Sequence, residues 1–316
     1  MLHVSRSLPD IAVLRGGNEE FGKSLMEGGE VLSSLKKLGY KPLDVLIDKD
    51  GHWTLQGVPS DAHEVFTRCH TIVDTTRAKS APHHALAKKM GMTMLFSRGN
   101  AVNMDREDMY RLLRMQGVKV PDTITVRAKA PLRDSLFREI WSTHHTPLLV
   151  RPTVKREGNE SKLITMYGEL ENTLREYHGK GTDVHILTYK RVPTTSLTVL
   201  PNFRGEKLYM PLWVETFADP KEIPNPRSIA KVYKNAPEWR KEQLRAIVEK
   251  VYDAAGLKGP AIIDVIWHND DYVVVNIEER PSLLKGSRFM QSLESTGANL
   301  GEYVHSQIQN SYFPNA

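Results

Sequence analysis

The stretch from Ala261 to Ser282 constrains the fold of this chain more than any other segment. Two apolar runs rich in β-branched residues flank the polar tetrapeptide at 268–271, a pattern that predicts a β-hairpin. Asp264 lies on the first predicted strand, and Asn276 and Glu278 lie on the second. Side chains two residues apart on a strand share a face, so Asn276 and Glu278 project together.

The predicted hairpin brings oxygen-bearing side chains together on an otherwise apolar surface. A loop of three residues, 269–271, would place Asp264 opposite Asn276, with Glu278 beside them. Carboxylate and amide oxygens suit a hard divalent cation such as Mg²⁺ and leave room for phosphate. Because Asp, Asn and Glu are also common at the solvated end of a hairpin, both interpretations stay open on these residues alone.

Length and composition describe a globular protein with more than one core. A chain of 316 residues usually divides into two or three domains. The lone Cys69 excludes an internal disulfide and fits a reducing cytoplasm. No apolar run approaches the length that spans a membrane, and the apolar segment 11–14 is too short for the core of a signal peptide. We therefore expect a cytoplasmic protein with no membrane partner.

The net charge of +5 comes from Lys and Arg residues that are scattered along the chain. A scattered excess suits a small anionic substrate such as a nucleotide. Because no basic run is interleaved with aromatic residues, we do not expect a nucleic-acid partner.

The N-terminal part has the pattern of a doubly wound α/β domain. A short apolar strand at 11–14 is followed by glycines at 16–17, a helix with an apolar stripe at 24–38, and a second strand at 41–48. Strand, glycine turn, helix and strand is the opening of that fold. Two glycines do not make a dinucleotide fingerprint, so a nicotinamide dehydrogenase is the weakest functional hypothesis.

The remaining two thirds of the chain predict α+β lobes. Strands at 147–152 and 162–166 flank a polar loop, a hairpin whose tip would close over phosphates unless it is an ordinary exposed turn. The other predicted elements are a helix at 105–116, strands at 184–190, 196–200 and 208–215, a helix at 239–255 and a last helix at 299–309.

Taken in order, these pieces resemble the ATP-grasp ligases, and specifically the D-alanine–D-alanine ligase family. In the C-terminal part, the family's G-x-K-G motif corresponds to GLKG at 256–259, its R-x-D motif to IID at 262–264, and its E-x-N-T-x-P-G motif to NIEERPS at 276–282. In the N-terminal part, the family's G-G, glutamate and S-L positions correspond to GG at 16–17, EE at 19–20 and SL at 24–25. The resemblance implies an α/β and α+β protein, an ATP-grasp fold with an N-terminal doubly wound (pre-ATP-grasp) domain. It divides the chain into an N-terminal α/β substrate domain at 1–102, a central ATP-grasp lobe at 103–184 and a C-terminal lobe at 185–316.

The resemblance also implies roles for individual residues. ATP would contact Arg111, Arg151, Arg156, Glu157, Gly158, Tyr189, Lys190 and Val192. Mg²⁺ or Mn²⁺ would bind Asp264, Asn276 and Glu278. Catalytic roles fall to Glu20, Asn159, Lys231 and Tyr233, and the amino-acid substrates would bind Glu20, Ser282 and Ser287. We expect Arg111, Arg151, Lys190 and Glu278 to line one cleft between the two lobes.

The chain departs from the family pattern at several of these positions. Arg111 and Arg151 stand where the family has phosphate-binding lysines, and Tyr189 and Ser196 replace residues that bind adenine and ribose. The family's metal-binding glutamate and asparagine occur in swapped order. Ile262 replaces an arginine that would stabilise the acyl phosphate, so we expect Ile262 to point toward the reacting group and Ile262→Arg to raise turnover.

The resemblance implies an ATP-dependent ligase that forms a C–N bond between two small amino acids through an acyl phosphate, as in the synthesis of peptidoglycan precursors for the cell wall. A homodimer is compatible with the family. Two alternatives stay open because of the replaced residues: a degenerate homologue that binds nucleotide or peptide without turnover, and an ATP-grasp ligase for a different acid and amine.

Overall fold

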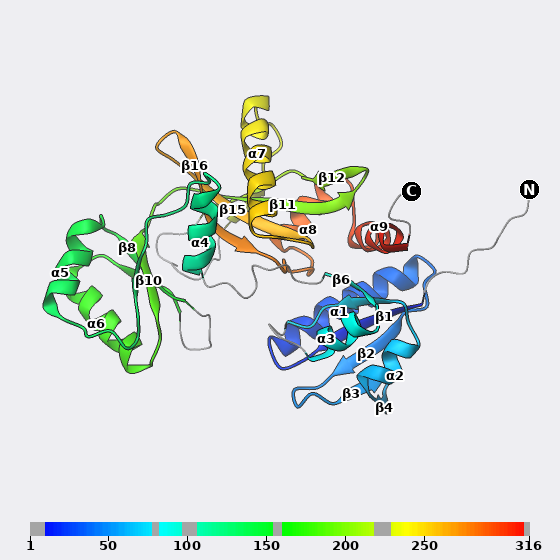
Figure 1. The fold of residues 1–316 in the computed structure, drawn as a ribbon. Coiled ribbons are helices and arrows are strands. Elements are labelled where there is room, and N and C mark those ends of the chain that lie inside the picture. The colour runs from blue at the N-terminus through cyan, green and yellow to red at the C-terminus, as the bar shows by residue number, and fades with distance from the viewer. Residues whose placement is uncertain (1–9, 78–81, 97–105, 154–159, 218–228, 313–316) are drawn as a thin grey trace, which may run out of the picture.

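The computed structural model describes residues 10–77, 82–96, 106–153, 160–217 and 229–312. Within these ranges the strands form three sheets that follow one another along the chain (Figure 1). Arg156, Glu157, Gly158 and Asn159, which the sequence places in the ATP and catalytic sites, lie outside the described residues. No helix in the described part of the chain is both long and apolar enough to cross a bilayer.

The N-terminal sheet has both faces covered by helices, as the sequence predicts. Its strands run in the order β4-β3-β2-β1-β5-β6. They are β1 (Ile11–Gly16), β2 (Leu43–Ile47), β3 (Trp53–Leu55), β4 (Val58–Ser60), β5 (Thr71–Asp74) and β6 (Thr93–Leu95). Ile11 and Val13 pack against α1 (Phe21–Lys37), whereas Ala12 and Leu14 pack on the side of α2 (Ala62–Thr67) and α3 (Pro82–Lys89). Burial on both faces explains why β1 is apolar at consecutive positions.

The central sheet is a small antiparallel layer with helices on one face. Its order is β7-β10-β8-β9, and its strands are β7 (Ile124–Val126), β8 (Leu148–Pro152), β9 (Lys162–Ile164) and β10 (Val184–Thr188). The helices α5 (Asp134–Thr143) and α6 (Tyr167–Gly179) share its apolar core. The predicted hairpin is present, because β8 pairs with β9 in antiparallel fashion.

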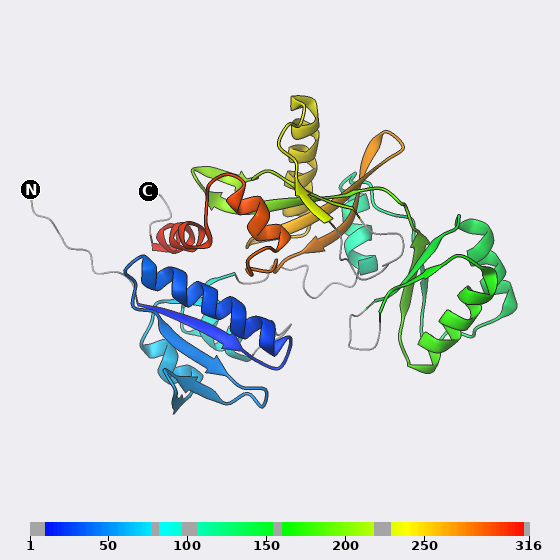
Figure 2. The same cartoon turned by 180° about the vertical axis from the view of Figure 1, so that it is seen from behind.

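The C-terminal sheet contains the hairpin that carries Asp264, Asn276 and Glu278. Its strands are β11 (Thr194–Phe203), β12 (Glu206–Tyr209), β13 (Val214–Phe217), β14 (Ile229–Val232), β15 (Ala261–His268) and β16 (Asp271–Glu278). One face packs on α4 (Arg106–Met115) and α7 (Glu238–Ala254). The other packs on α8 (Arg288–Glu294) and α9 (Leu300–Tyr312). Seen from behind in Figure 2, α1 (blue) and α8 (orange-red) lie toward the viewer.

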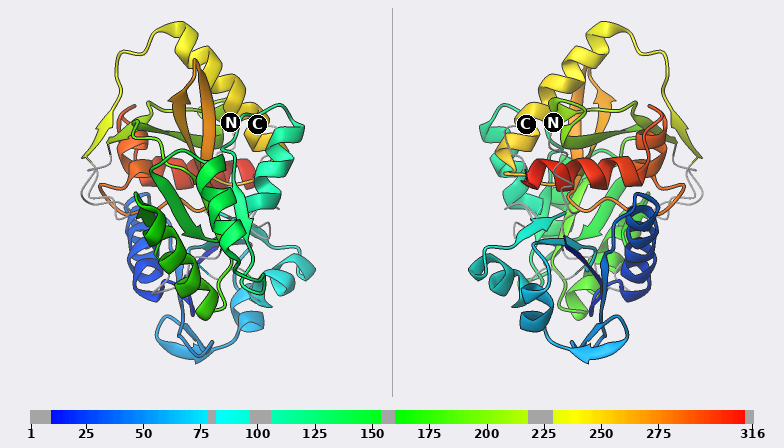
Figure 3. Two further views of the ribbon diagram at one scale, coloured as in Figure 1. Left: turned by 90° about the vertical axis from the view of Figure 1, so that its left-hand side faces the viewer. Right: turned by 90° about the vertical axis from the view of Figure 1, so that its right-hand side faces the viewer.

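Two elements join the parts of the chain more closely than a division at 103 and 185 implies. Met109, Tyr110 and Leu113 of α4 pack in the core of the C-terminal sheet, although α4 was assigned to the central lobe. The helix α9, drawn red in Figure 3, lies between the N-terminal domain and the C-terminal sheet, and its Tyr303 and Val304 share one core with both. The division of the chain into domains at 103 and 185 therefore remains a prediction from the sequence.

The hairpin of β15 and β16 has the predicted pairing but not the predicted loop. Asn269 and Asp270 form a two-residue turn with φ of 50° and 59°, a left-handed conformation that Asn and Asp tolerate. A bulge between Asp264 and Val265 shifts the register, and only beyond it does Asp264 face Asn276. The prediction of a three-residue loop is wrong. The turn is one residue shorter, and the bulge adds one unpaired residue, so that Asp264 still pairs with Asn276.

A buried ion pair of the N-terminal domain is hydrogen-bonded to the loop after β16. Arg77 donates to both oxygens of Glu27, at 2.6 Å to Oε1 and 2.7 Å to Oε2. Glu27 also accepts from the hydroxyl of Ser282 at 2.9 Å and from the backbone N–H of Leu283 at 3.1 Å. A carboxylate that is 2% exposed is thus held by donors from both parts of the chain, which satisfies its charge and its lone pairs.

The buried His83 at the start of α3 predicts a pH-dependent stability. Burial lowers the pKa of His83 from 6.5 to about 4, against the opposing influence of Asp74. Because the folded chain binds this proton less readily than the unfolded chain, the stabilisation is complete above pH 6.5 and is lost as the pH falls toward about 4. The loss is about 3 kcal/mol at most.

We expect urea unfolding of His83→Gln to lack this part of the pH dependence, since the variant has no imidazole to protonate. His63→Gln is the matched control, because it makes the same substitution at an exposed histidine. Equal profiles for His83→Gln and the natural chain would contradict the assignment to His83.

Candidate functional site

A pocket of about 820 Å³ lies between the central and C-terminal sheets. Thr194, Ile266 and Val273 form its wall on the C-terminal sheet, and they share one face because Thr194 and Val273 both pair with Ile266. Leu149 of β8 and Leu187 of β10 line the opposite wall. Apolar walls with a few polar groups, at this volume, are typical of a site for a small organic ligand.

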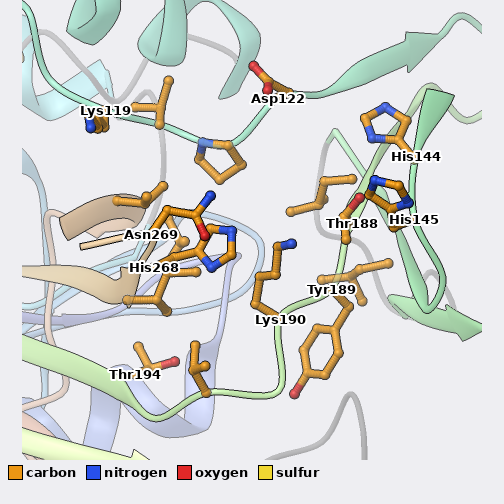
Figure 4. A pocket seen from close by; sticks show the side chains of 18 of the residues that line it. Lys119, Asp122, His144, His145, Thr188, Tyr189, Lys190, Thr194, His268 and Asn269 are labelled. Carbon is orange, nitrogen blue, oxygen red and sulfur yellow. The ribbon is translucent and has the colours of Figure 1, made fainter. Parts of the chain in front are cut away.

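The structure brings four of the predicted ATP-binding residues to this pocket. Arg151, Tyr189, Lys190 and Val192 all line it. Figure 4 shows Lys190 extending into the pocket, with Thr194 and His268 on one side. Arg151 Nε is buried and has no hydrogen-bond partner in the described structure, so it is a donor available to an anionic ligand. Burial raises the pKa of Tyr189, and the Arg191 charge opposes that shift, so Tyr189 offers a neutral hydroxyl.

Arg111, the other predicted phosphate ligand, is not at this site. Its side chain is 73% exposed and pairs with Asp108 at 2.7 Å. The arginine of α4 that reaches the hairpin is Arg106, whose Nη2 donates to Asn276 Oδ1 at 3.4 Å. Arg106 lies four residues before the buried Tyr110 and so shares its helical face, whereas Arg111 does not. The spacing of the apolar residues along α4 would have predicted that Arg106, and not Arg111, faces the hairpin.

The three residues predicted to bind metal converge on the pocket's own face of the sheet. Asp264 lies two residues before Ile266 and therefore faces the same way. Asn276 Nδ2 donates to Asp264 Oδ2 at 3.0 Å, and Glu278 follows two residues later on β16. Asp264, Asn276 and Glu278, called the acidic group below, thus continue the pocket wall toward the N-terminal domain. Burial raises the pKa of Glu278, and the charge of Arg288 opposes this effect.

Arg288, which no sequence motif singles out, lies between the side chains of this acidic group. Its Nη1 donates to Asp264 Oδ1 at 2.6 Å and to Ser196 Oγ at 2.7 Å. Its Nη2 donates to Glu278 Oε2 at 3.1 Å. Ser196 in turn donates to Asp264 Oδ1 at 2.7 Å. No spacing rule connects Arg288 with the hairpin, because it arrives from the first turn of α8 across a loop.

The chemistry of these side chains fits a divalent cation. Asp264 and Glu278 supply two carboxylates, and Asn276 carries an amide oxygen, the oxygen types that hard cations prefer. In this structure Asn276 Oδ1 accepts from Arg106 while its NH₂ group faces Asp264, so the amide would have to turn over to act as a ligand. The guanidinium of Arg288 already lies within hydrogen-bonding distance of both carboxylates. A cation at this position would therefore have to take the place of that guanidinium.

Lys231 and Tyr233, predicted to act in catalysis, are not brought to the acidic group. Strand pairing aligns Lys231 with Glu215 and then with Thr195 and Val265, so Lys231 lies on the face opposite Asp264. The ring of Tyr233 stacks on Trp213 at 5.7 Å, and the Arg240 guanidinium lies 5.0 Å from its centroid. These contacts place Tyr233 in the packing beneath α7.

The predicted substrate-binding residues lie at the seam between the N-terminal domain and the C-terminal sheet. Glu20 precedes α1 with a left-handed φ of 46° and faces Lys23 at 3.4 Å and Arg77 at 3.9 Å. Ser287 caps α8 by accepting from the N–H of Met290, and its hydroxyl donates to the carbonyl of Ser282 at 2.6 Å. Ser282 is bonded to Glu27, so both serines shape the loop in this structure.

Ile262 does not point toward a reacting group, contrary to the sequence-based expectation. It shares a face with Asp264, but its side chain is 1% exposed and belongs to the core that includes Leu283 and Phe289. Its cross-strand neighbour is Glu278, and the guanidinium bonded to Glu278 comes from Arg288. The positive charge that the sequence lacks at position 262 is present nearby, on a different element.

Comparison with known proteins places this geometry in a known fold. No family model matches the chain. A D-alanine–D-alanine ligase from Francisella philomiragia is 22% identical over 168 residues, 52% of this chain and 54% of that protein, so the match spans about half the length of the curated relative.

The similarity of the structures extends over nearly the whole chain. The D-alanine–D-alanine ligase from Bacillus anthracis, solved in complex with ATP, superposes with a TM-score of 0.75 at 16% identity, covering 96% of this chain and 98% of that one. The VanG D-Ala:D-Ser ligase from Enterococcus faecalis has a TM-score of 0.74 at 14% identity over 96% and 99%. The D-alanine–D-alanine ligase from Coxiella burnetii has a TM-score of 0.76 at 14% identity over 95% and 93%. The chain therefore has the ATP-grasp fold of the D-alanine–D-alanine ligases, in a divergent sequence.

Proposed function

We propose that this protein is an ATP-dependent carboxylate–amine ligase that joins two amino acids. The observation that supports the proposal best is the continuity of one surface. The pocket between the two sheets leads along β15 from Ile266 to Asp264, and the acidic group then meets the N-terminal domain. A nucleotide in the pocket would have its base between the sheets and its phosphates beside the acidic group.

In the proposed reaction, the γ-phosphoryl group of ATP passes to the carboxylate of the first amino acid and gives an acyl phosphate and ADP. The amine of the second amino acid then attacks the acyl carbon, and phosphate leaves. Arg151 and Lys190 would hold phosphate oxygens, since both line the pocket and carry positive charge. A divalent cation held by Asp264, Asn276 and Glu278 would neutralise charge that develops on the transferring group.

The amino acids would bind where the N-terminal domain meets the hairpin. Glu20 is half-exposed there and is available to an ammonium group as a charge-assisted hydrogen bond. The charges of Lys23 and Arg77 oppose the rise in the pKa of Glu278, which supports a position of these residues near the acidic group. Substrates held at this seam would meet the phosphate end of the nucleotide.

We expect phosphate release from ATP that depends on an added amino acid, because an ATP-grasp ligase transfers phosphate only to a bound carboxylate. The measurement is phosphate release with Mg²⁺ and ATP against a panel of D- and L-amino acids, with the dipeptide product identified by mass spectrometry. D-Alanine and D-serine, the amino acids named for the relatives of similar structure, are tested first.

Calorimetric titration with ATP distinguishes the competing accounts. Binding of Mg²⁺–ATP without phosphate release for any amino acid would favour a homologue that binds nucleotide and does not turn over. Absence of nucleotide binding would contradict the proposed site as a whole.

A further inference from the structure

The positive charge at the acidic group comes from a side chain of the protein, the guanidinium of Arg288. Asp264 and Glu278 carry two negative charges, and Arg288 supplies one positive charge within 2.6 Å and 3.1 Å of them. The Asp264 side chain is 7% exposed, and those of Glu278 and Arg288 are each 31% exposed. In a partly buried setting the attraction between such charges is stronger than in water, so the pairing affects whatever else binds there.

The hydrogen bonds of Arg288 use the same lone pairs that a metal ion would need. Asp264 Oδ1 accepts from Arg288 and from Ser196, which occupies both of its lone pairs. Asp264 Oδ2 accepts from the amide of Asn276. A divalent cation that binds between Asp264 and Glu278 must compete with Arg288 for Oδ1 of Asp264, and moving Arg288 breaks charge-assisted bonds to two carboxylates.

We propose that Arg288 is an internal counter-ion that keeps the acidic group from binding a free divalent cation, so that the metal binds together with the nucleotide. The inference rests on the proposed function, since it concerns the same site. A nucleotide in the pocket brings phosphate oxygens to the acidic group, and the guanidinium then has a new anionic partner to which it is well suited. Asp264 and Glu278 would then be available to hold the metal.

The side chain of Arg288 is placed to make this exchange. It extends from the first residue of α8, and it is the most exposed member of its ion pair with Asp264. The backbone beneath it is held independently, because Ser287 caps the helix and Phe289 is buried in the core. A change of side-chain rotamer can thus redirect the guanidinium without rearrangement of the helix.

The direct test is titration of the whole protein with Mn²⁺, followed by the paramagnetic resonance signal of the free ion. Without nucleotide, we expect Arg288→Met to bind Mn²⁺ at least about tenfold more tightly than the natural chain, because the competing charge is gone. With a non-hydrolysable ATP analogue present, the natural chain should bind Mn²⁺ tightly and the difference should narrow. Arg204→Met is the matched control, since it makes the same substitution at an arginine that pairs with a single carboxylate, Glu302, away from the acidic group.

Thermal unfolding provides a second readout that does not depend on the resonance signal. Mn²⁺ without nucleotide should raise the unfolding temperature of Arg288→Met and leave that of the natural chain nearly unchanged, because only the variant binds the free ion. If Arg288→Met does not fold, Arg288→Lys replaces it. A single ammonium cannot bridge both carboxylates as the guanidinium does, so its Mn²⁺ affinity should also exceed that of the natural chain.

Two results would overturn the proposal, and they can be told apart. Equal Mn²⁺ affinity of the natural chain and the Arg288 variants without nucleotide would show that Arg288 does not compete, while the metal site itself would stand. If no form of the protein takes up Mn²⁺ with or without the ATP analogue, the metal site is absent and the proposed function fails with it.

Discussion

Asp264→Asn is expected to lower amino-acid-dependent phosphate release by about a thousandfold, because a metal-binding carboxylate supplies several kcal/mol of transition-state stabilisation and each 1.4 kcal/mol corresponds to about tenfold in rate. Asp264 accepts hydrogen bonds from Ser196, Asn276 and Arg288, so it lies at the centre of this network. An asparagine would remove the charge and place an NH₂ group opposite one of these donors. The rate at saturating ATP and amino acid measures the effect.

The matched control for this substitution lies on the same hairpin. Asp270→Asn makes the same chemical change in the exposed turn, where a φ of 59° suits asparagine as well as aspartate. It should leave the rate and the free energy of unfolding close to those of the natural chain. Comparable rates for Asp264→Asn and Asp270→Asn would show that Asp264 has no part in the reaction.

Ile262→Arg is expected to destabilise the fold by more than about 4 kcal/mol, because it places a charged group in an apolar core. Ile262 is 1% exposed and packs in the core that also contains Leu200, Leu283 and Phe289. The nearest acidic side chains, Glu278 and Asp264, are already bonded to Arg288, so a new guanidinium would have to compete with Arg288 for them. The structure therefore reverses the expectation from sequence that this substitution raises turnover.

The free energy of unfolding in urea, measured for the natural chain and the variant, tests this prediction. Ile262→Val is the conservative control, and its loss of a single methylene should cost only about 0.5–1.5 kcal/mol. A folded Ile262→Arg protein with increased turnover would instead restore the sequence-based view that position 262 faces the reacting group.

Local patterns were sufficient for the elements that bury their own apolar residues. The consecutive apolar positions of β1, the helical stripe of α1 and the glycines between them predicted a strand covered on both faces, and Ile11 to Leu14 are buried as expected. Alternation along a strand predicted that Asn276 and Glu278 share a face, but the pairing of Asp264 with Asn276 agrees with the prediction only because the bulge offsets the shorter turn. The family resemblance, supported by these same motifs, led to the ATP-grasp fold.

What the sequence did not decide were contacts between elements that are distant in the chain or that depend on one residue of register. Lys231 lies on the face of its sheet opposite Asp264, since a shift of one residue moves every side chain of a strand to the other side. Tyr233 follows β14 and packs on Trp213. The position of Arg288 follows from how α8 packs on β11 and β15, and no periodicity within the chain encodes that docking. Sequence alone thus determined the fold and the acidic hairpin, whereas the charge at its centre was decided by tertiary packing, because an ion pair requires only proximity in space.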